Sequence, residues 1–314
     1  MHPKESRPSV LVIAATDSSG GAGLSRDVRV LTDFSADPLC VVTAVTAQSD
    51  KRVVAVHHVP PEVIRAQLTA ALETRRVGAV KIGMLGTRAT VEAVAEALAA
   101  AVAMMTAEAG TPATGGTADD GMPPRLSRVL SHGLTTHATI PIVLDPVLVS
   151  SSGGILLDAR GRKALLEKLL PLATLVTPNV PEIAALLAEP AATDEIELVN
   201  QARRLIESGC QAILLKGGHA TGEEAVDLLV TRAQTPEPDR RQGESTKAGA
   251  PALNIIVERI TSIRVPATSR GTGCALASAI AASLASGHSL AEACKRAKRY
   301  VLETMLTPPA PPER

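Results

Sequence analysis

The 314-residue sequence is almost without aromatic residues, having one Phe, one Tyr and no Trp. Proteins that bind single-stranded nucleic acid stack bases on aromatic side chains, so this mode of binding is nearly excluded. The 32 basic and 32 acidic residues balance and form no long block of one sign, which leaves no electrostatic footprint for nucleic acid or an anionic membrane. These absences favour a small-molecule partner, with neither nucleic acid nor a membrane.

Cysteine is scarce, and long hydrophobic runs are missing. The four cysteines stand far apart, with neither Cys-x-x-Cys nor zinc spacing, so we expect free thiols in a reducing compartment. No apolar run approaches the roughly 20 residues of a membrane span, and the first residues lack the apolar stretch of a signal peptide. The sequence therefore predicts a cytoplasmic protein, and its 45% of hydrophobic residues suits a globular core.

Apolar runs of strand length recur along the chain. They are continuous rather than alternating, which is typical of parallel strands buried on both faces. The runs cover residues 9–15, 39–48, 79–85, 140–144, 175–177, 212–215 and 255–265. Helices are expected at 60–75, 90–105 and 290–305, and after several of the runs. We predict one three-layer α/β domain over residues 1–314, with a core of about 9–305 and helices flanking a mostly parallel central sheet.

Two segments lack the pattern of packed structure. Residues 106–120 form a Gly/Ala/Thr/Pro tract without a hydrophobic period, which predicts a disordered insertion reaching to about residue 138. Residues 231–252 are polar and contain Pro, Gly and Arg, which predicts a mobile loop. Both are expected to lie outside the core.

A glycine-rich turn stands between the last strand run and an Ala-rich helix. Gly271 and Gly273 let the backbone turn sharply and approach a ligand, and the helix start offers unpaired N–H donors. This pattern predicts an anion site that suits a phosphate. Cys274 lies in the first turn, where the helix dipole is expected to lower the pKa of its thiol towards neutrality. The alternative is a turn that caps an ordinary helix, with Cys274 as a small buried residue.

Charged residues follow three other strand runs. Asp145 comes directly after one run, and Glu182 lies in the first turn of the helix after the next. Because Mg²⁺ prefers few protein carboxylates together with phosphate oxygens, these two acids could hold it through water. Lys216 ends a further run beside paired glycines, where it would meet a phosphate. Taken separately, each acid is more often a helix cap or a surface charge.

A glycine-rich loop at 16–23 follows the first strand run and has the spacing of neither a P-loop nor a dinucleotide fingerprint. It is expected to bring backbone close to a small ligand, since open α/β sheets bind ligands at this edge. The alternative is a solvent turn with Asp17 as a helix cap. Gln48 ends the second run, and its amide can pair with the edge of a heterocycle. Met84 is by default a packing residue.

Taken in order, these strand-end motifs resemble the ribokinase-like family, and within it the kinases that act on hydroxymethylpyrimidine and phosphomethylpyrimidine. The resemblance covers about residues 9–303, apart from the two polar segments. It is carried by segments 15–23, 43–48, 81–85, 144–147, 177–182, 216–219 and 271–274. It implies a ribokinase-like three-layer sandwich, in agreement with the fold predicted above.

The resemblance also implies site roles, position by position. The residues implied to line the pyrimidine pocket are Asp17, Gly21, Ala22, Gln48, Met84 and Val147. Those implied to manage Mg²⁺ and the nucleotide phosphates are Asp145, Asn179 and Glu182, with Lys216 on the nucleotide side. Gly271, Thr272 and Gly273 would form the anion hole for the transferring phosphoryl group, with Cys274 as the candidate base.

The activity implied is ATP- and Mg²⁺-dependent phosphorylation of 4-amino-5-hydroxymethyl-2-methylpyrimidine and of its monophosphate, for thiamine diphosphate biosynthesis, by a homodimer. Ala15, Ser25-Arg26 and Arg270 depart from the family's usual residues, Arg270 standing where His is usual. One alternative is a pyridoxal kinase of the same fold. The other is a catalytically silent pyrimidine-binding protein.

Overall fold

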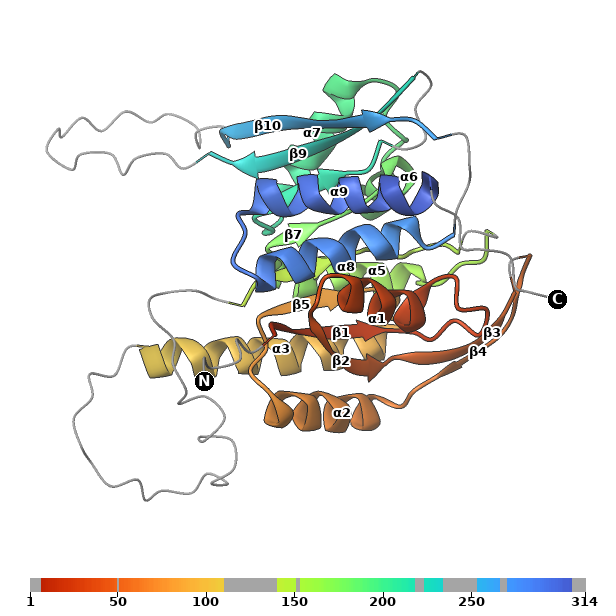
Figure 1. Cartoon of the computed structure of the whole chain (residues 1–314), viewed down its shortest axis with the longest axis vertical. Helices are drawn as coiled ribbons and strands as arrows, with labels where there is room; N and C mark the ends of the chain where they lie inside the picture. The colour runs from red at the N-terminus through yellow and green to blue at the C-terminus, as the bar shows by residue number, and fades with distance from the viewer. Residues whose placement is uncertain are drawn as a thin grey trace, which may run out of the picture.

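The structure is a computed structural model that describes residues 7–49, 51–109, 140–150, 153–217, 223–233, 253–265 and 270–306. Among these residues, eight strands form one sheet in the order β10-β9-β8-β7-β6-β5-β1-β2 (Figure 1). They are β1 (Ser9–Ala14), β2 (Asp37–Val42), β5 (Ala79–Ile82), β6 (Ile142–Leu144), β7 (Leu175–Val176), β8 (Ala212–Leu215), β9 (Glu224–Arg232) and β10 (Ile255–Ile263). Strands β1, β2, β5, β6, β7 and β8 run parallel, whereas β9 pairs antiparallel with both β8 and β10. The mostly parallel sheet that the sequence predicts is confirmed.

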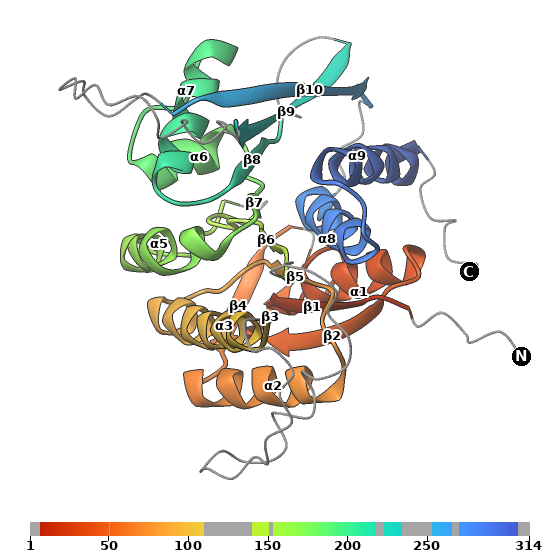
Figure 2. The same ribbon diagram turned by 90° about the vertical axis from the view of Figure 1, so that its left-hand side faces the viewer.

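Helices cover both faces of this sheet, which Figure 2 shows nearly edge-on. One face carries α1 (Gly23–Asp33), α8 (Thr272–Ala285) and α9 (Leu290–Leu306). The other face carries α2 (Pro61–Thr74), α3 (Arg88–Ala109), α5 (Ala159–Ala164), α6 (Val180–Leu187) and α7 (Glu195–Glu207). The three-layer α/β sandwich is therefore confirmed.

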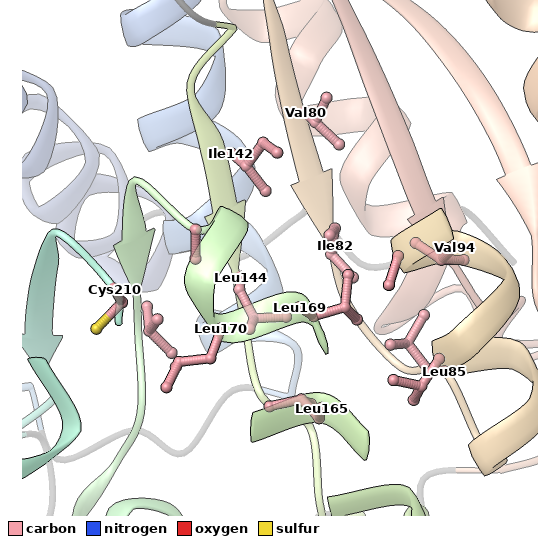
Figure 3. Packing of buried hydrophobic residues seen from close by; sticks show 14 of the residues in the cluster. Val80, Ile82, Leu85, Val94, Ile142, Leu144, Leu165, Leu169, Leu170 and Cys210 are labelled. Carbon is pink, nitrogen blue, oxygen red and sulfur yellow. The ribbon is translucent and has the colours of Figure 1, made fainter. Parts of the chain in front are cut away.

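Each central strand buries both of its faces, because successive side chains point to opposite sides of a sheet. In β1, Leu11 and Ile13 pack on the α2–α3 side, while Val10 and Val12 pack against α1 and α8. Figure 3 shows the first of these cores, built from aliphatic side chains of the strands and of helices α3 and α5 with the turns that follow it. The continuous apolar runs in the sequence follow directly from this two-sided burial.

The run at 39–48 is two strands rather than the single strand that the sequence predicts. The chain leaves the main sheet at Thr43, whose N–H bonds Ala14 and whose hydroxyl donates to the Met84 carbonyl oxygen at 2.6 Å. It continues as β3 (Ala44–Gln48), which pairs antiparallel with β4 (Val53–His58). This β3–β4 hairpin projects beyond the end of β2 (Figure 1). The buried Thr43 thus redirects the chain through hydrogen bonds to residues that are distant in sequence. The pattern of apolar residues contains no signal for such bonds.

The two polar segments lie mostly outside the described residues. Helix α3 runs to Ala109, so the first residues of the predicted insertion continue a helix, and 110–139 are not described. Likewise, Thr231 and Arg232 belong to β9 rather than to a loop, and 234–252 are not described. Both boundaries predicted from composition were therefore a few residues too early, because α3 and β9 continue past the last clear apolar run.

The chain's one Phe and one Tyr pack against each other where α1 meets α9. Phe34 and Tyr300 lie edge to face with ring centroids 5.2 Å apart, and the Tyr300 hydroxyl donates to Asp33 Oδ2 at 2.5 Å. Burial, followed by this hydrogen bond and the charge of Asp33, raises the pKa of Tyr300 to about 12. The contact joins the first and last helices of one layer.

We expect the near-ultraviolet absorbance of the folded protein to titrate as a single tyrosine with a midpoint near pH 12. An unfolded chain ionises near pH 10, so the contribution of Tyr300 to stability is complete below about pH 10 and is lost between about pH 10 and 12. Asp33→Asn should lower the midpoint. A midpoint near 10, with circular dichroism showing a folded protein, would contradict the contact.

Candidate active site at the carboxyl edge of the sheet

Parallel strands bring their carboxyl ends to one edge of the sheet, and the polar motifs of the sequence gather there. Strands β1, β5, β6, β7 and β8 all end at this edge, where α1, α6 and α8 begin. The hairpin β3–β4 and the first turn of α8 lie on the same side of the molecule (Figure 1). Open α/β sheets bind ligands at such an edge.

The start of α8 forms a glycine cradle, the backbone of Gly271, Thr272, Gly273 and Cys274. Gly271 is the N-cap, with φ of 72° in the left-handed region that glycine tolerates. A side-chain carbon at Gly271 would lie 2.2 Å from the Gly21 carbonyl oxygen, so only glycine fits against the loop before α1. The N–H groups of the first turn have no partner within the helix and face the edge. The predicted turn and helix start are present.

An acid–lysine cluster faces the cradle. Lys216 Nζ lies 2.9 Å from Asp145 Oδ1 and 3.4 Å from Glu182 Oε2, and the Thr177 hydroxyl donates to Asp145 Oδ1 at 3.2 Å. A side-chain carbon on Gly273 would lie 3.3 Å from Lys216 Nζ and 3.7 Å from Asp145 Oδ2. The structure therefore joins three of the predicted residues to the cradle.

Burial and mutual charge set the ionisation of this cluster. Burial alone would lower the pKa of Lys216, but the carboxylates of Asp145 and Glu182 more than offset it, so its pKa lies above the ordinary value. Burial raises the pKa of Glu182, and Lys216 opposes that shift. Lys216 is thus a permanent cation, which suits contact with phosphate oxygens.

Asn179 and Glu182 also cap α6. The Asn179 side chain accepts from the Glu182 N–H, and Glu182 Oε2 accepts from the Asn179 N–H, both at 2.8 Å. This capping box accounts for the Asn179 side chain, and the capping alternative holds for Glu182. Asp145 Oδ2 and Glu182 Oε1 take no hydrogen bond from the described residues. Two such carboxylate oxygens beside an anion cradle fit Mg²⁺ bound with water and phosphate.

A second group joins the loop after β1 to the hairpin. Asp17 is buried; its Oδ1 accepts from the Ser19 N–H and hydroxyl, and its Oδ2 lies 3.4 Å from Arg270 Nη2. Arg270 also donates to the Ser49 carbonyl oxygen at 3.0 Å. Asp17 therefore does not cap α1, whose N-cap is Ala22 without a side-chain cap, and the capping alternative for Asp17 is wrong.

Gln48 is held at this group by its backbone. Its N–H donates to the Ser18 hydroxyl at 2.9 Å, and that hydroxyl donates to the Gln48 carbonyl oxygen at 2.8 Å. The half-buried Gln48 amide makes no hydrogen bond with the described residues, which leaves both its donor and its acceptor available for a ligand.

Met84 and Val147 are less clearly joined to this group. Met84 is half-buried and lines a cavity of about 360 Å³ together with Val56, His58 and Ile155, so it is more than a core residue. Its backbone is tied to the hairpin base through Thr43. Val147 is half-buried beside Asp145 and does not line that cavity. Of the predicted pyrimidine set, Asp17 and Gln48 thus belong to the group at the hairpin, Met84 lines the cavity, and Val147 belongs to neither.

The thiol of Cys274 differs from the prediction. Burial raises its pKa to about 11; Lys81 and the hydrogen bond from the Gly23 N–H oppose the rise, while Asp27 and Asp145 add to it. Desolvation of the thiolate outweighs the helix dipole, so the predicted fall towards neutrality is wrong. Cys40 is exposed, so we expect iodoacetamide to label Cys40 before Cys274.

Sequence reasoning missed the residues that support the site from behind. Lys81, fully buried in β5, pairs with Asp27 of α1. A charged residue inside an apolar strand run was a signal for this pair. The contact between Arg270 and Asp17 spans 253 positions and had no local signal.

Within the described ranges, no helix is long and apolar enough to cross a membrane. In the same part of the chain, no group of three or more His, Cys, Asp or Glu residues is placed to hold a metal ion. A metal at this edge would therefore depend on two carboxylates with other oxygen ligands.

Comparison with known proteins agrees with this geometry. A model of the phosphomethylpyrimidine kinase family matches residues 17–114, 123–250 and 255–311. The chain belongs to the phosphomethylpyrimidine kinase family. One relative in this family, the hydroxymethylpyrimidine/phosphomethylpyrimidine kinase of Rhizobium meliloti (strain 1021), is 34% identical over 297 residues, which cover 93% of this chain and 88% of that protein.

Solved structures share the fold of the phosphomethylpyrimidine kinase family member described here. The phosphomethylpyrimidine kinase of Clostridium difficile 630 has a TM-score of 0.64 and 27% identity, covering 95% of this chain and 99% of that one. The pyridoxal kinase of Staphylococcus aureus in complex with AMP-PCP and pyridoxal has a TM-score of 0.67 and 24% identity, covering 96% and 88%. The family resemblance seen in the sequence is confirmed.

Proposed function

We propose that the protein is a kinase that transfers the γ-phosphoryl group of ATP to 4-amino-5-hydroxymethyl-2-methylpyrimidine and then to the resulting monophosphate, in the pyrimidine branch of thiamine diphosphate biosynthesis. The observation that carries this proposal is the position of the glycine cradle. It lies between the acid–lysine cluster on one side and the Asp17–Gln48 group on the other. The nucleotide would occupy the first side and the pyrimidine the second.

The nucleotide side is built for phosphate oxygens. The Lys216 ammonium lies 3.3 Å from where a side-chain carbon at Gly273 would be, beside the first N–H groups of α8. Phosphoryl transfer depends on positioning and charge stabilisation of this kind. Asp145 and Glu182 would hold Mg²⁺, which neutralises phosphate charge when it is bound. Use of ATP is supported by the related pyridoxal kinase in complex with AMP-PCP.

On the pyrimidine side, the free Gln48 amide would pair with the aminopyrimidine edge and orient the 5-hydroxymethyl group towards the cradle. Cys274 would accept the hydroxyl proton as the oxygen attacks the γ-phosphorus and the bond to the bridging oxygen of ATP breaks. With the monophosphate as acceptor, a phosphate oxygen takes the place of the hydroxyl and no such proton needs removal. A cytoplasmic homodimer built from one domain per chain completes the proposal.

The pyrimidine alcohol is expected to show a higher kcat/KM than pyridoxal, because the Gln48 amide matches the aminopyrimidine edge. Gln48→Leu should lower kcat/KM for the pyrimidine at least tenfold and change that for pyridoxal much less, since a lost buried partner weakens only the pairing that used it. Coupled ADP release with each alcohol measures both values.

Gln211→Leu is the matched control, because Gln211 is exposed and precedes β8 at the opposite edge of the sheet. It should behave as the unmodified protein does. Better turnover of pyridoxal would assign the protein as a pyridoxal kinase. Binding of the pyrimidine without any ADP release would assign it as a silent binding protein.

A further inference from the structure

A fully buried ion pair, Lys81–Asp27, lies behind the glycine cradle and has no role in the proposed reaction so far. Lys81 Nζ donates to Asp27 Oδ2 at 2.8 Å, and the Ser278 hydroxyl donates to Asp27 Oδ1 at 2.8 Å. Both charged side chains are wholly shielded from solvent. Buried ion pairs are weak contributors to stability, because removing the two charges from water offsets most of their attraction. The pair therefore needs a reason beyond stability.

The geometry directs the Lys81 ammonium towards the carboxyl edge. Lys81 and Gly83 share one face of the chain at β5, since side chains alternate along a strand. A side-chain carbon at Gly83 would lie 2.8 Å from Lys81 Nζ, so the amine reaches forward over a position that glycine leaves open. Ser278 follows Cys274 by four residues and therefore lies on the same face of α8. The network thus reaches α8 one helical turn beyond Cys274.

Four charged groups act on the Cys274 thiol from the elements around it. Lys81 of β5 favours the thiolate, whereas Asp27 of α1 and Asp145 after β6 oppose it. The fourth, Lys216, lies within 3.4 Å of two carboxylates, which balance its charge. Lys81 is the strongest of the charged neighbours in favouring the thiolate.

Lys81 remains charged although it is buried. Burial alone would lower its pKa, but Asp27, followed by Cys274 and Asp145, raises it above the ordinary value. The positive charge at this position is therefore permanent at any pH at which the protein works.

We propose that Lys81 is a positioning residue of the transfer reaction, held by Asp27 so that its charge lies beneath the first turn of α8 and stabilises the thiolate of Cys274. This inference rests on the proposed function, in which Cys274 accepts the hydroxyl proton. Asp27 in turn holds the amine in place and, through Ser278, ties it to the helix that carries Cys274.

The test replaces both partners, because a lone Asp27 would be left buried and unpaired. Lys81→Met with Asp27→Asn removes both charges and keeps an acceptor for Ser278. The matched control is Lys298→Met with Asp227→Asn, the same exchange at a 2.8 Å ion pair between α9 and β9 whose side chains are 9% exposed; the Asn keeps an acceptor for the Gly217 N–H. Cys40→Ser in every protein removes the exposed thiol from the labelling reaction.

Labelling of Cys274 by iodoacetamide at fixed pH, followed by peptide mass spectrometry, reports its thiolate fraction without any substrate. We expect about threefold slower labelling in the Lys81/Asp27 variant, as for a pKa about half a unit higher, because the lost Lys81 favours the thiolate more than the lost Asp27 opposes it, and no change in the control. A purely structural role predicts the reverse, because a loosened core would expose Cys274 and speed its labelling.

Steady-state kinetics of the same variants test whether the Lys81 charge affects the transfer reaction. We expect kcat for the pyrimidine alcohol to fall about threefold or more, with the KM for ATP unchanged, while the control keeps its activity within about 1.5-fold. Unchanged or faster labelling overturns the inference, as does an unchanged kcat in a folded variant. If the unmodified protein transfers no phosphate, the proposed function fails, while the labelling result still reports whether Lys81 sets the state of the thiol.

Discussion

Cys274→Ala is expected to lower kcat for the pyrimidine alcohol by roughly 10²- to 10⁴-fold, the usual contribution of a general base, with little change in substrate Kd or Tm. Ser at this position should be nearly as poor, because its hydroxyl is no base near pH 7. Asp should recover part of the rate. Steady-state kinetics of the three variants, with Tm from circular dichroism, measure these effects.

The raised pKa of the thiol adds a second signature. A pKa of about 11 leaves little thiolate near neutrality, and that fraction grows about tenfold per pH unit until the pKa is reached. We expect kcat of the unmodified enzyme to rise steeply between about pH 7 and 9, and Cys274→Ala to lose most of that slope. The sign follows from the base being active only when deprotonated.

Cys294→Ala is the matched control, since Cys294 is a buried cysteine in α9 away from the carboxyl edge. It should lose some stability through lost packing and keep its activity. Near-full activity in Cys274→Ala would remove the base from the mechanism. The glycine cradle and the acid–lysine cluster would then have to catalyse phosphoryl transfer without a general base.

Gly271→Ala is expected to lower kcat about 100-fold or more by opening the cradle. The new carbon would lie 2.2 Å from the Gly21 carbonyl oxygen and 3.2 Å from the Ala22 Cα, so α8 must move away from the loop before α1. That movement separates the free N–H groups of the cradle from the pocket wall. A 1 Å misplacement of such groups costs about 100-fold in rate.

Gly287→Ala, at the other end of α8, separates this effect from backbone strain. Gly287 has φ of 86°, yet a side-chain carbon there meets nothing within 4 Å. Both variants therefore bear a left-handed strain of about 1–2 kcal/mol, and both should lower Tm. Only Gly271→Ala should lose activity. Equal kcat in the two variants would mean that the close approach of Gly271 and Gly21 does not matter for the reaction.

Much of the fold could be predicted from the sequence, because strands that are buried on both faces consist of continuous apolar residues. Strands such as β1 and β8 read as continuous apolar runs, and the residues at their ends, Asp145 and Lys216, are brought together by the parallel arrangement alone. The glycine turn before α8 was equally visible, because left-handed backbone at Gly271 requires glycine.

Other features depend on contacts that no local pattern encodes. The chain leaves the sheet at Thr43 because of its hydrogen bonds to Ala14 and Met84, so one apolar run became two strands. Arg270 contacts Asp17, which lies 253 positions earlier in the sequence. The pKa of Cys274 depends on how deeply the helix start is buried, and the sequence showed the helix dipole but not the desolvation.

The most direct test of the proposed function is a product analysis of the unmodified protein with ATP, Mg²⁺ and 4-amino-5-hydroxymethyl-2-methylpyrimidine. Mass spectrometry of the mixture over time should show the monophosphate first and the diphosphate afterwards, with one ADP released for each phosphate transferred. The absence of any phosphorylated pyrimidine, from a folded protein that binds both ATP and the alcohol, would contradict the account.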